Sequence, residues 1–143
     1  TSGVEVLNMA VDDENAESAE NTPRLAIPSG VEVFEVNGPF FFGVANKFEE
    51  AEKQVTKKPK IRIIRLYRVP FMDATGLSNL RSFIRKTQGN GIKVIISGPV
   101  KSVAEALEKH GFPELVGSEN ICADINLALK RAETLLETMK RKA

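Results

Sequence analysis

Residues 61–76 read IRIIRLYRVPFMDATG, and this stretch decides the fold. Its first nine residues are mostly apolar and β-branched, which predicts a central buried strand, and Pro70 ends that strand. The remainder places Asp73 and Thr75 between the carboxyl end of a strand and the amino end of a helix. Free backbone N–H groups at a helix start favour an anion or a capping side chain, so either Asp73 or Thr75 could cap this helix.

Downstream of this stretch, helices and strands alternate. Residues 76–87 predict an amphipathic helix, because Leu77, Leu80, Phe83 and Ile84 share one helical face. Gly89-Asn90-Gly91 ends it. The later segments predict a strand over 93–97, a helix over 101–110, a brief strand over 121–123 and a long helix over 124–140.

Upstream, residues 4–9 predict an edge strand and residues 46–55 a helix. Residues 31–37 (VEVFEVN) alternate apolar and acidic side chains, which predicts a strand with one solvated face. The whole pattern predicts an α/β fold: a mixed sheet of four to five strands with about four helices, mainly on one face. Part of the sheet should then have a polar, uncovered face.

Composition is that of one ordinary globular domain over residues 1–143, with a formal charge of +1 that does not favour nucleic acid. The single Cys122 and the single His110 exclude an internal disulfide and a cluster of soft metal ligands. We interpret Cys122 as a core side chain and His110 as a helix end. No apolar run reaches the ~18–20 residues that span a bilayer.

Two segments are predicted to lie outside the packed domain. Residues 11–23 (VDDENAESAENTP) are acidic and small, so we expect a mobile loop. Residues 140–143 form a basic tail. Because the chain begins at Thr1 and not at Met, we also expect a piece of a longer protein.

The residues Asp73-Ala74-Thr75-Gly76, after a buried strand and opening a helix, resemble the motif of STAS domains. Residues 27–30 (IPSG) and 38–42 (GPFFF) resemble the sulfate-transporter branch of that family, in order and at the right spacing. The resemblance covers roughly residues 4–138. It implies the STAS fold, with Phe40-Phe41-Phe42 packed inside.

The resemblance also implies a role. We expect this chain to be the C-terminal regulatory and interaction domain of a sulfate-type anion transporter, at the cytoplasmic face of the cell membrane. We do not expect it to be an enzyme. The expected partners are the membrane portion of the same transporter, a cytosolic protein, and a second copy through the full-length transporter. The expected contact surface is Asp73, Ala74, Thr75 and Gly76. No cofactor and no metal are expected.

Two alternatives use the same helix start. In the antagonist branch of the family, the hydroxyl residue before the glycine is phosphorylated by a partner kinase, so Thr75 would be the switch of a stand-alone anti-sigma factor antagonist. The second is nucleotide binding at the Thr75 helix terminus, although no P-loop lysine accompanies it.

The central strand departs from the family in carrying Arg62, Arg65 and Arg68. Strand periodicity predicts Arg62 and Arg68 on one face and Arg65 on the other. A wholly buried Arg62 or Arg65 would need a partner carboxylate, so we expect both near the rim or on the uncovered face.

Overall fold

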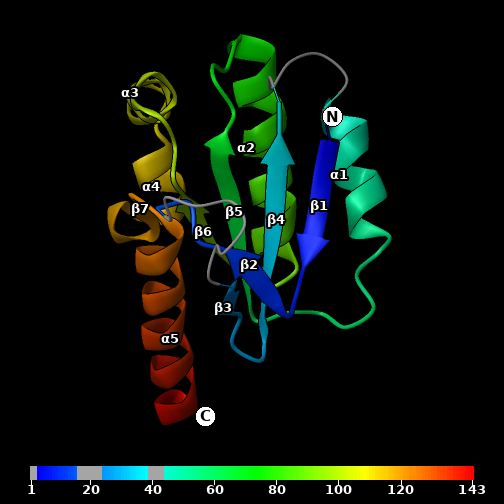
Figure 1. Cartoon of the computed structure of the whole chain (residues 1–143), viewed down its shortest axis with the longest axis vertical. Coiled ribbons are helices and arrows are strands. Elements are labelled where there is room, and N and C mark those ends of the chain that lie inside the picture. The colour runs from blue at the N-terminus through cyan, green and yellow to red at the C-terminus, as the bar shows by residue number, and fades with distance from the viewer. Residues whose placement is uncertain (1–2, 16–23, 39–43) are drawn as a thin grey trace.

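The computed structural model describes residues 3–15, 24–38 and 44–143 (Figure 1). The elements follow the chain as β1 (Gly3–Leu7), β2 (Ala10–Asp12), β3 (Arg24–Ala26), β4 (Val31–Asn37), α1 (Val44–Glu52), β5 (Ile61–Arg68), α2 (Ala74–Gly89), β6 (Lys93–Ser97), α3 (Lys101–Lys109), α4 (Phe112–Val116), a short 3-10 helix (Ser118–Asn120), β7 (Ile121–Cys122) and α5 (Ile125–Lys142). The alternation of strands and helices predicted from residue 31 onward is therefore confirmed. The sequence pattern did not predict the short elements β2, β3 and α4.

Five strands form one mixed sheet in the order β1-β4-β5-β6-β7. β1 is the predicted edge strand and pairs antiparallel with β4, while β4, β5, β6 and β7 run parallel. β5 lies at the centre, and residues 61–66 are all buried. The parallel strands bring their carboxyl ends to one edge of the sheet, so the segments after β5 and β6 leave from the same edge.

Helices cover this sheet unequally. The core on one face takes side chains from α1, α2, α3 and α4, including the predicted inward residues of α2: Leu77, Leu80, Phe83 and Ile84. The core on the other face takes Ile125, Ala128, Leu129 and Ala132 from α5, together with Val11 of β2. The prediction that the helices lie mainly on one face is confirmed.

The solvated face predicted for residues 31–37 is wrong. Residues 31–36 of β4 are all buried, and Glu32 and Glu35 are only 5% and 8% exposed. Alternation failed as a guide because both glutamates point at arginines of the neighbouring strand and not at water. α5 and the small β2–β3 sheet cover the face that was expected to be open.

The loop predicted over residues 11–23 is wrong for its first residues. Val11 is fully buried in β2, which pairs antiparallel with β3, and residues 13–15 contact the start of α5. Residues 16–23 lie outside the described part of the chain, as do Phe40, Phe41 and Phe42, whose core packing the sequence predicted. The basic tail is mostly helical, because α5 continues to Lys142.

Candidate functional site

The segment between β5 and α2 builds the predicted contact surface. Asp73 is the N-cap residue of α2, since its Oδ1 accepts a hydrogen bond of 2.8 Å from the Gly76 backbone N–H. This decides between the two capping residues that the sequence left open, because it satisfies one of the free donors at the helix start. Thr75 instead lies within the first turn of the helix, so its hydroxyl is not needed as the cap.

Exposure divides the four predicted contact residues. Asp73, Ala74 and Thr75 are exposed, whereas Gly76 is buried. Two large apolar side chains are also exposed at this edge: Phe71, at 52%, comes just before Asp73, and Val100, at 37%, precedes α3. The surface therefore combines polar groups at a helix start with apolar side chains from two neighbouring loops.

Hydrogen bonds tie this surface to the elements around it. The Ser102 hydroxyl donates to the Pro70 carbonyl at 3.3 Å, which joins the start of α3 to the loop before α2. The Arg81 guanidinium donates to the His110 carbonyl, and the Gln88 amide donates to the Leu115 carbonyl at 2.9 Å. α2 is thus fastened along its length to the α3–α4 region, and the loops hold their positions relative to it.

Arg62 is completely buried on the face covered by α2, and not at the rim as predicted. Its Nε donates to Glu32 Oε1 at 2.7 Å and its Nη1 to the Thr87 hydroxyl at 2.9 Å. Its Nη2 lies 3.0 Å from Glu52 Oε2, an ion pair whose angles fall short of a hydrogen bond. The guanidinium also lies over the Phe34 ring, 4.3 Å from its centre. The partner carboxylate required for a buried Arg62 is therefore present, and it is joined by a second.

Arg65 is completely buried on the opposite face, again against the prediction. Its Nη1 lies 3.5 Å from Glu35 Oε1, and its Nη2 contacts both Glu14 Oε1, at 3.2 Å, and the Asp12 carbonyl, at 2.6 Å. The Tyr67 ring stacks beneath the guanidinium at 4.3 Å. Two carboxylates again accompany a buried arginine.

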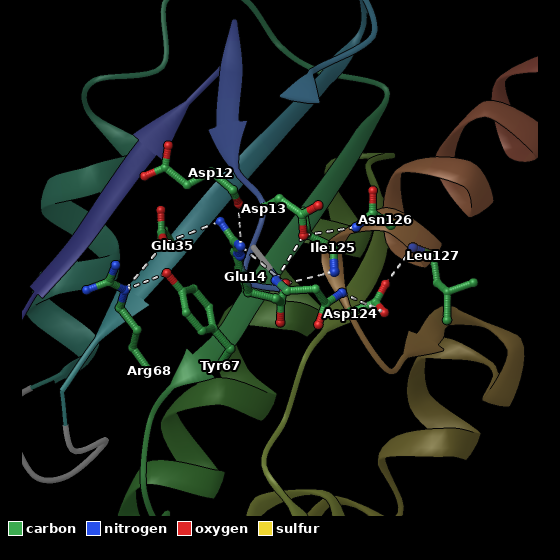
Figure 2. A network of polar contacts seen from close by, with 12 residues as sticks. Asp12, Asp13, Glu14, Glu35, Tyr67, Arg68, Asp124, Ile125, Asn126 and Leu127 are labelled. Atoms are coloured by element: carbon green, nitrogen blue, oxygen red, sulfur yellow. Dashed lines mark hydrogen bonds and ion pairs between the residues drawn. The ribbon is translucent and has the colours of Figure 1, made fainter. Parts of the chain in front are cut away.

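Arg68 lies with the Arg65 group and not with Arg62, contrary to the predicted alternation. Its Nε donates to the Tyr67 hydroxyl at 2.7 Å and lies 3.8 Å from Glu35 Oε1, as Figure 2 shows. The pairing of β4 with β5 explains this, because between the Glu35–Arg65 and Asn37–Arg68 pairs two residues of β5 lie opposite one residue of β4. Such an irregularity changes which face a side chain takes.

Burial raises the pKa of Glu32 above its ordinary value of 4.5, and the nearby Arg62 opposes that rise. Burial likewise raises the pKa of Glu35, against the opposing charges of Arg65 and Arg68. In both cases the loss of hydration exceeds the attraction of the arginines. Burial also raises the pKa of the half-buried Cys122, which packs against the α5-side core as a small side chain.

We also searched the described residues for pockets, metal sites and membrane-spanning helices. An open pocket of about 120 Å³ lies between α1 and α2, with Phe48, Phe83 and Lys86 among its lining residues. Across residues 3–15, 24–38 and 44–143, no group of three or more histidine, cysteine or acidic side chains could hold a metal ion. Within the same ranges, no helix is both long enough and apolar enough to cross a bilayer. His110 follows the last residue of α3, where the sequence placed it.

Comparison with known proteins identifies the family. The STAS domain model matches residues 22–128, three quarters of the chain. The chain is a STAS domain. This STAS domain is 39% identical to the SulP transporter STAS domain of Vibrio cholerae, with a TM-score of 0.70 over 79% of this chain and 88% of that one. It is 37% identical to a sulfate transporter family protein of Wolinella succinogenes, with a TM-score of 0.74 over 88% of this chain and 99% of that one.

Two further relatives have lower sequence identity to this chain. The STAS domain is 28% identical over 63% of its length to the "Putative sulfate transporter YvdB" of Bacillus subtilis, but it spans only 17% of that protein. A "putative anti-sigma factor antagonist" of Thermotoga maritima, at 17% identity and a TM-score of 0.59 over 73% of this chain and 89% of that one, shares the fold. The resemblance to the sulfate-transporter type of STAS domain is confirmed.

Sequence reasoning missed the two buried arginine groups, although the sequence contains a signal for them. Glu32 and Glu35 are three residues apart in β4, and Arg62 and Arg65 are three residues apart in β5. The two spacings match, and in the sheet Glu32 pairs with Arg62 and Glu35 with Arg65. Equal spacing of opposite charges in two neighbouring parallel strands would have predicted both pairs.

Proposed function

We propose that this STAS domain is a regulatory and interaction domain of a SulP-type anion transporter, and that it acts by binding and not by catalysis. The observation that carries the proposal is the surface at the start of α2. Asp73, Ala74 and Thr75 are exposed there on a helix that is fastened to its neighbours, beside the exposed apolar side chains of Phe71 and Val100. Exposed apolar side chains next to polar groups are typical of a surface that contacts another protein.

The relatives support the transporter context. The STAS domains that are 37% and 39% identical carry the names of a sulfate transporter family protein and a SulP transporter. In this proposal the domain lies at the cytoplasmic face of the cell membrane, as the C-terminal part of the transporter. Its partners are the membrane portion of the same transporter, a cytosolic protein, and a second copy brought close by the full-length protein. The contacts would support assembly, trafficking or the regulation of transport.

A charge placed on Thr75 tests the proposal. In the full-length transporter, Thr75→Glu should change the rate of anion uptake by at least about threefold, because the new carboxylate alters the exposed surface at the start of α2. The matched control is Ser78→Glu, which adds the same charge one turn further along the exposed side of α2. The isolated domain should keep its melting temperature in both variants, since an acidic side chain is favourable in the first turn of a helix and the exposed Ser78 side chain makes room for glutamate in the solvent.

If Thr75→Glu and Ser78→Glu leave uptake and surface expression equally unchanged while both domains stay folded, the start of α2 is not the contact surface. A change in uptake that is the same for both variants would contradict the assignment as well, because it would reflect the added charge and not its position.

The second candidate is a stand-alone anti-sigma factor antagonist switched by phosphorylation of Thr75. The exposure of Thr75 supports it, because a kinase could reach the hydroxyl and the helix start would tolerate the added charge. The identities of 37% and 39% favour the transporter type. The reading frame upstream of Thr1 distinguishes the two: a run of hydrophobic spans supports the transporter, and a start codon just upstream supports the antagonist.

A further inference from the structure

We propose that Glu14 occupies, from within the chain, a latent binding site for a small oxyanion. The site is made by the Arg65 guanidinium, the backbone N–H of Ile125 and the Ser97 hydroxyl. A free oxyanion of the same chemistry as the Glu14 carboxylate would compete for it. This inference does not depend on the surface at Asp73–Thr75, so either can fail alone.

The Glu14 carboxylate is held as a bound anion would be. Its Oε1 accepts a hydrogen bond of 2.8 Å from the backbone N–H of Ile125, which is the first residue of the 18-residue helix α5. The same oxygen lies 3.2 Å from Arg65 Nη2. Figure 2 shows Glu14 reaching the start of α5 from the segment after β2. Backbone N–H groups at helix starts and guanidinium groups both bind oxyanions in proteins.

The loop after β6 also lies close to the Glu14 carboxylate. Gly98 follows β6 with φ +69°, and a Cβ built on it would lie 2.7 Å from Glu14 Oε2. Only glycine therefore leaves room for the carboxylate against this backbone. The side chain of Glu14 is 9% exposed, so the anion lies in a nearly closed site between the ends of β5, β6 and the start of α5.

Two buried polar atoms on this face of the sheet have no hydrogen-bond partner among the described residues: Arg65 Nε, which belongs to the guanidinium that contacts Glu14, and Ser97 Oγ. Both residues are fully buried, and they pair with each other in the β5–β6 register, so they point to the same face of the sheet. Ser97 immediately precedes Gly98. Because buried polar groups are normally satisfied, two unused donors beside a carboxylate indicate a site built for more oxygen atoms than Glu14 supplies.

Glu14 can leave its arginine more easily than Glu32 and Glu35 can leave theirs. Glu32 and Glu35 belong to β4, inside the five-stranded sheet, whereas Glu14 follows a strand of three residues in a separate two-stranded sheet. The contacts that hold its neighbours are exposed: Asp13 to Asn126 at 3.1 Å, and Asn15 to Asp124 at 3.2 Å. A tethered ligand competes as though at millimolar concentration, so removing its carboxylate should free the site for an added anion.

The test titrates the 143-residue domain with sodium sulfate, phosphate or acetate, against sodium chloride at equal ionic strength. The backbone amide signal of Ile125 and the melting temperature are followed. In Glu14→Ala, at least one oxyanion should shift the Ile125 signal saturably, with an apparent Kd at least about tenfold lower than in the wild type. Asp13→Ala is the matched control, because it removes an acid from the same segment but leaves the Glu14 carboxylate in the site, and its apparent Kd should be much nearer to that of the wild type than to that of Glu14→Ala. Adding Ser97→Ala to Glu14→Ala should weaken binding again.

The proposal is overturned if Glu14→Ala responds to all three oxyanions no more than to chloride, or if its apparent Kd equals that of the wild type and Asp13→Ala. Should Glu14→Ala not fold, Glu14→Gln is titrated instead. It keeps the volume, but its neutral amide binds Arg65 and the Ile125 N–H less strongly than a carboxylate does, so an added oxyanion should displace it at a lower concentration than in the wild type. The comparison of oxyanions then tells whether a tetrahedral or a planar group fits the site.

Discussion

Arg62 and Arg65 are both buried in the central strand, three residues apart, but they join different parts of the fold on the two faces of the sheet. Arg62 meets Glu32, Glu52 and Thr87, which belong to β4, α1 and α2. Arg65 meets Glu35 of β4, but its other carboxylate comes from Glu14 in the segment after β2. One arginine joins main elements of the fold, and the other holds a peripheral segment in place.

The pairs with β4 have a common consequence for strand register. Glu32 pairs with Arg62 and Glu35 with Arg65, and the members of each pair point to the same face. A slip of one residue between β4 and β5 would leave both arginines buried without their β4 carboxylates. Burying an ion pair gives little net stability, because desolvation offsets most of the attraction, but leaving one member alone is costly. The two pairs therefore specify the β4–β5 register more than they stabilise the sheet.

The largest effect is expected on the α2 side. Arg62→Met should lower the free energy of unfolding by about 3–5 kcal/mol, because it leaves the Glu32 carboxylate buried without a cation. Urea denaturation measures this. The matched control is Arg68→Met in the same strand, whose side chain is 56% exposed and whose loss should cost less than about 1 kcal/mol. If the loss comes from the unpaired Glu32 carboxylate, the double variant Arg62→Met/Glu32→Leu should recover most of the lost free energy of unfolding.

A smaller loss, about 2–3 kcal/mol, is expected for Arg65→Met on the α5 side. Its ion pairs, at 3.2 and 3.5 Å, are longer than those of Arg62, and Glu35 keeps Arg68 nearby. Hydrogen exchange at the Ile125 amide should also become faster, because Glu14 loses one of its two partners. If Arg65→Met costs as much as Arg62→Met and leaves that exchange unchanged, the proposed difference between the faces is wrong.

The smallest effect is a change in pH dependence. Burial raises the pKa of Glu35 above 4.5, so in the window just above pH 4.5 the folded chain binds more protons than the unfolded one. The contribution of Glu35 to the free energy of unfolding therefore falls as the pH rises through that window. Glu35→Gln removes this contribution, and its stability should fall less steeply.

Unfolding in urea at a series of pH values tests this, with Glu32→Gln as the comparison. Burial raises the pKa of Glu32 as well, but Arg62 Nε lies only 2.7 Å from its carboxylate, so the change in slope should be smaller. Equal slopes for Glu35→Gln and the wild type would show that Glu35 does not titrate in this window.

Much of the fold could be predicted because it depends on local pattern. The β-branched run at 61–69 and the apolar face of α2 follow from the spacing of apolar residues, and a capping residue at 73 or 75 follows from the free N–H groups of a helix start. β3 and α4 could not be predicted, since three and five residues are too short for a periodic signal. The burial of Arg62 and Arg65 was missed because charge alone argues for water, and three of the compensating carboxylates, Glu32, Glu35 and Glu14, are 30 or 51 residues away in the sequence.

By itself, the sequence determined the alternation of strands and helices from residue 31 onward, a helix start near residues 73–76 and the resemblance to the STAS family, because each is carried by neighbouring residues or by a motif. Only the tertiary structure decided which charges are buried and what they hold together. Glu14 and Ile125 are 111 residues apart, and Glu32 and Arg62 are 30 apart. The free energy of such groups depends on the partners and the solvent that the folded chain brings to them, and no local pattern contains that information.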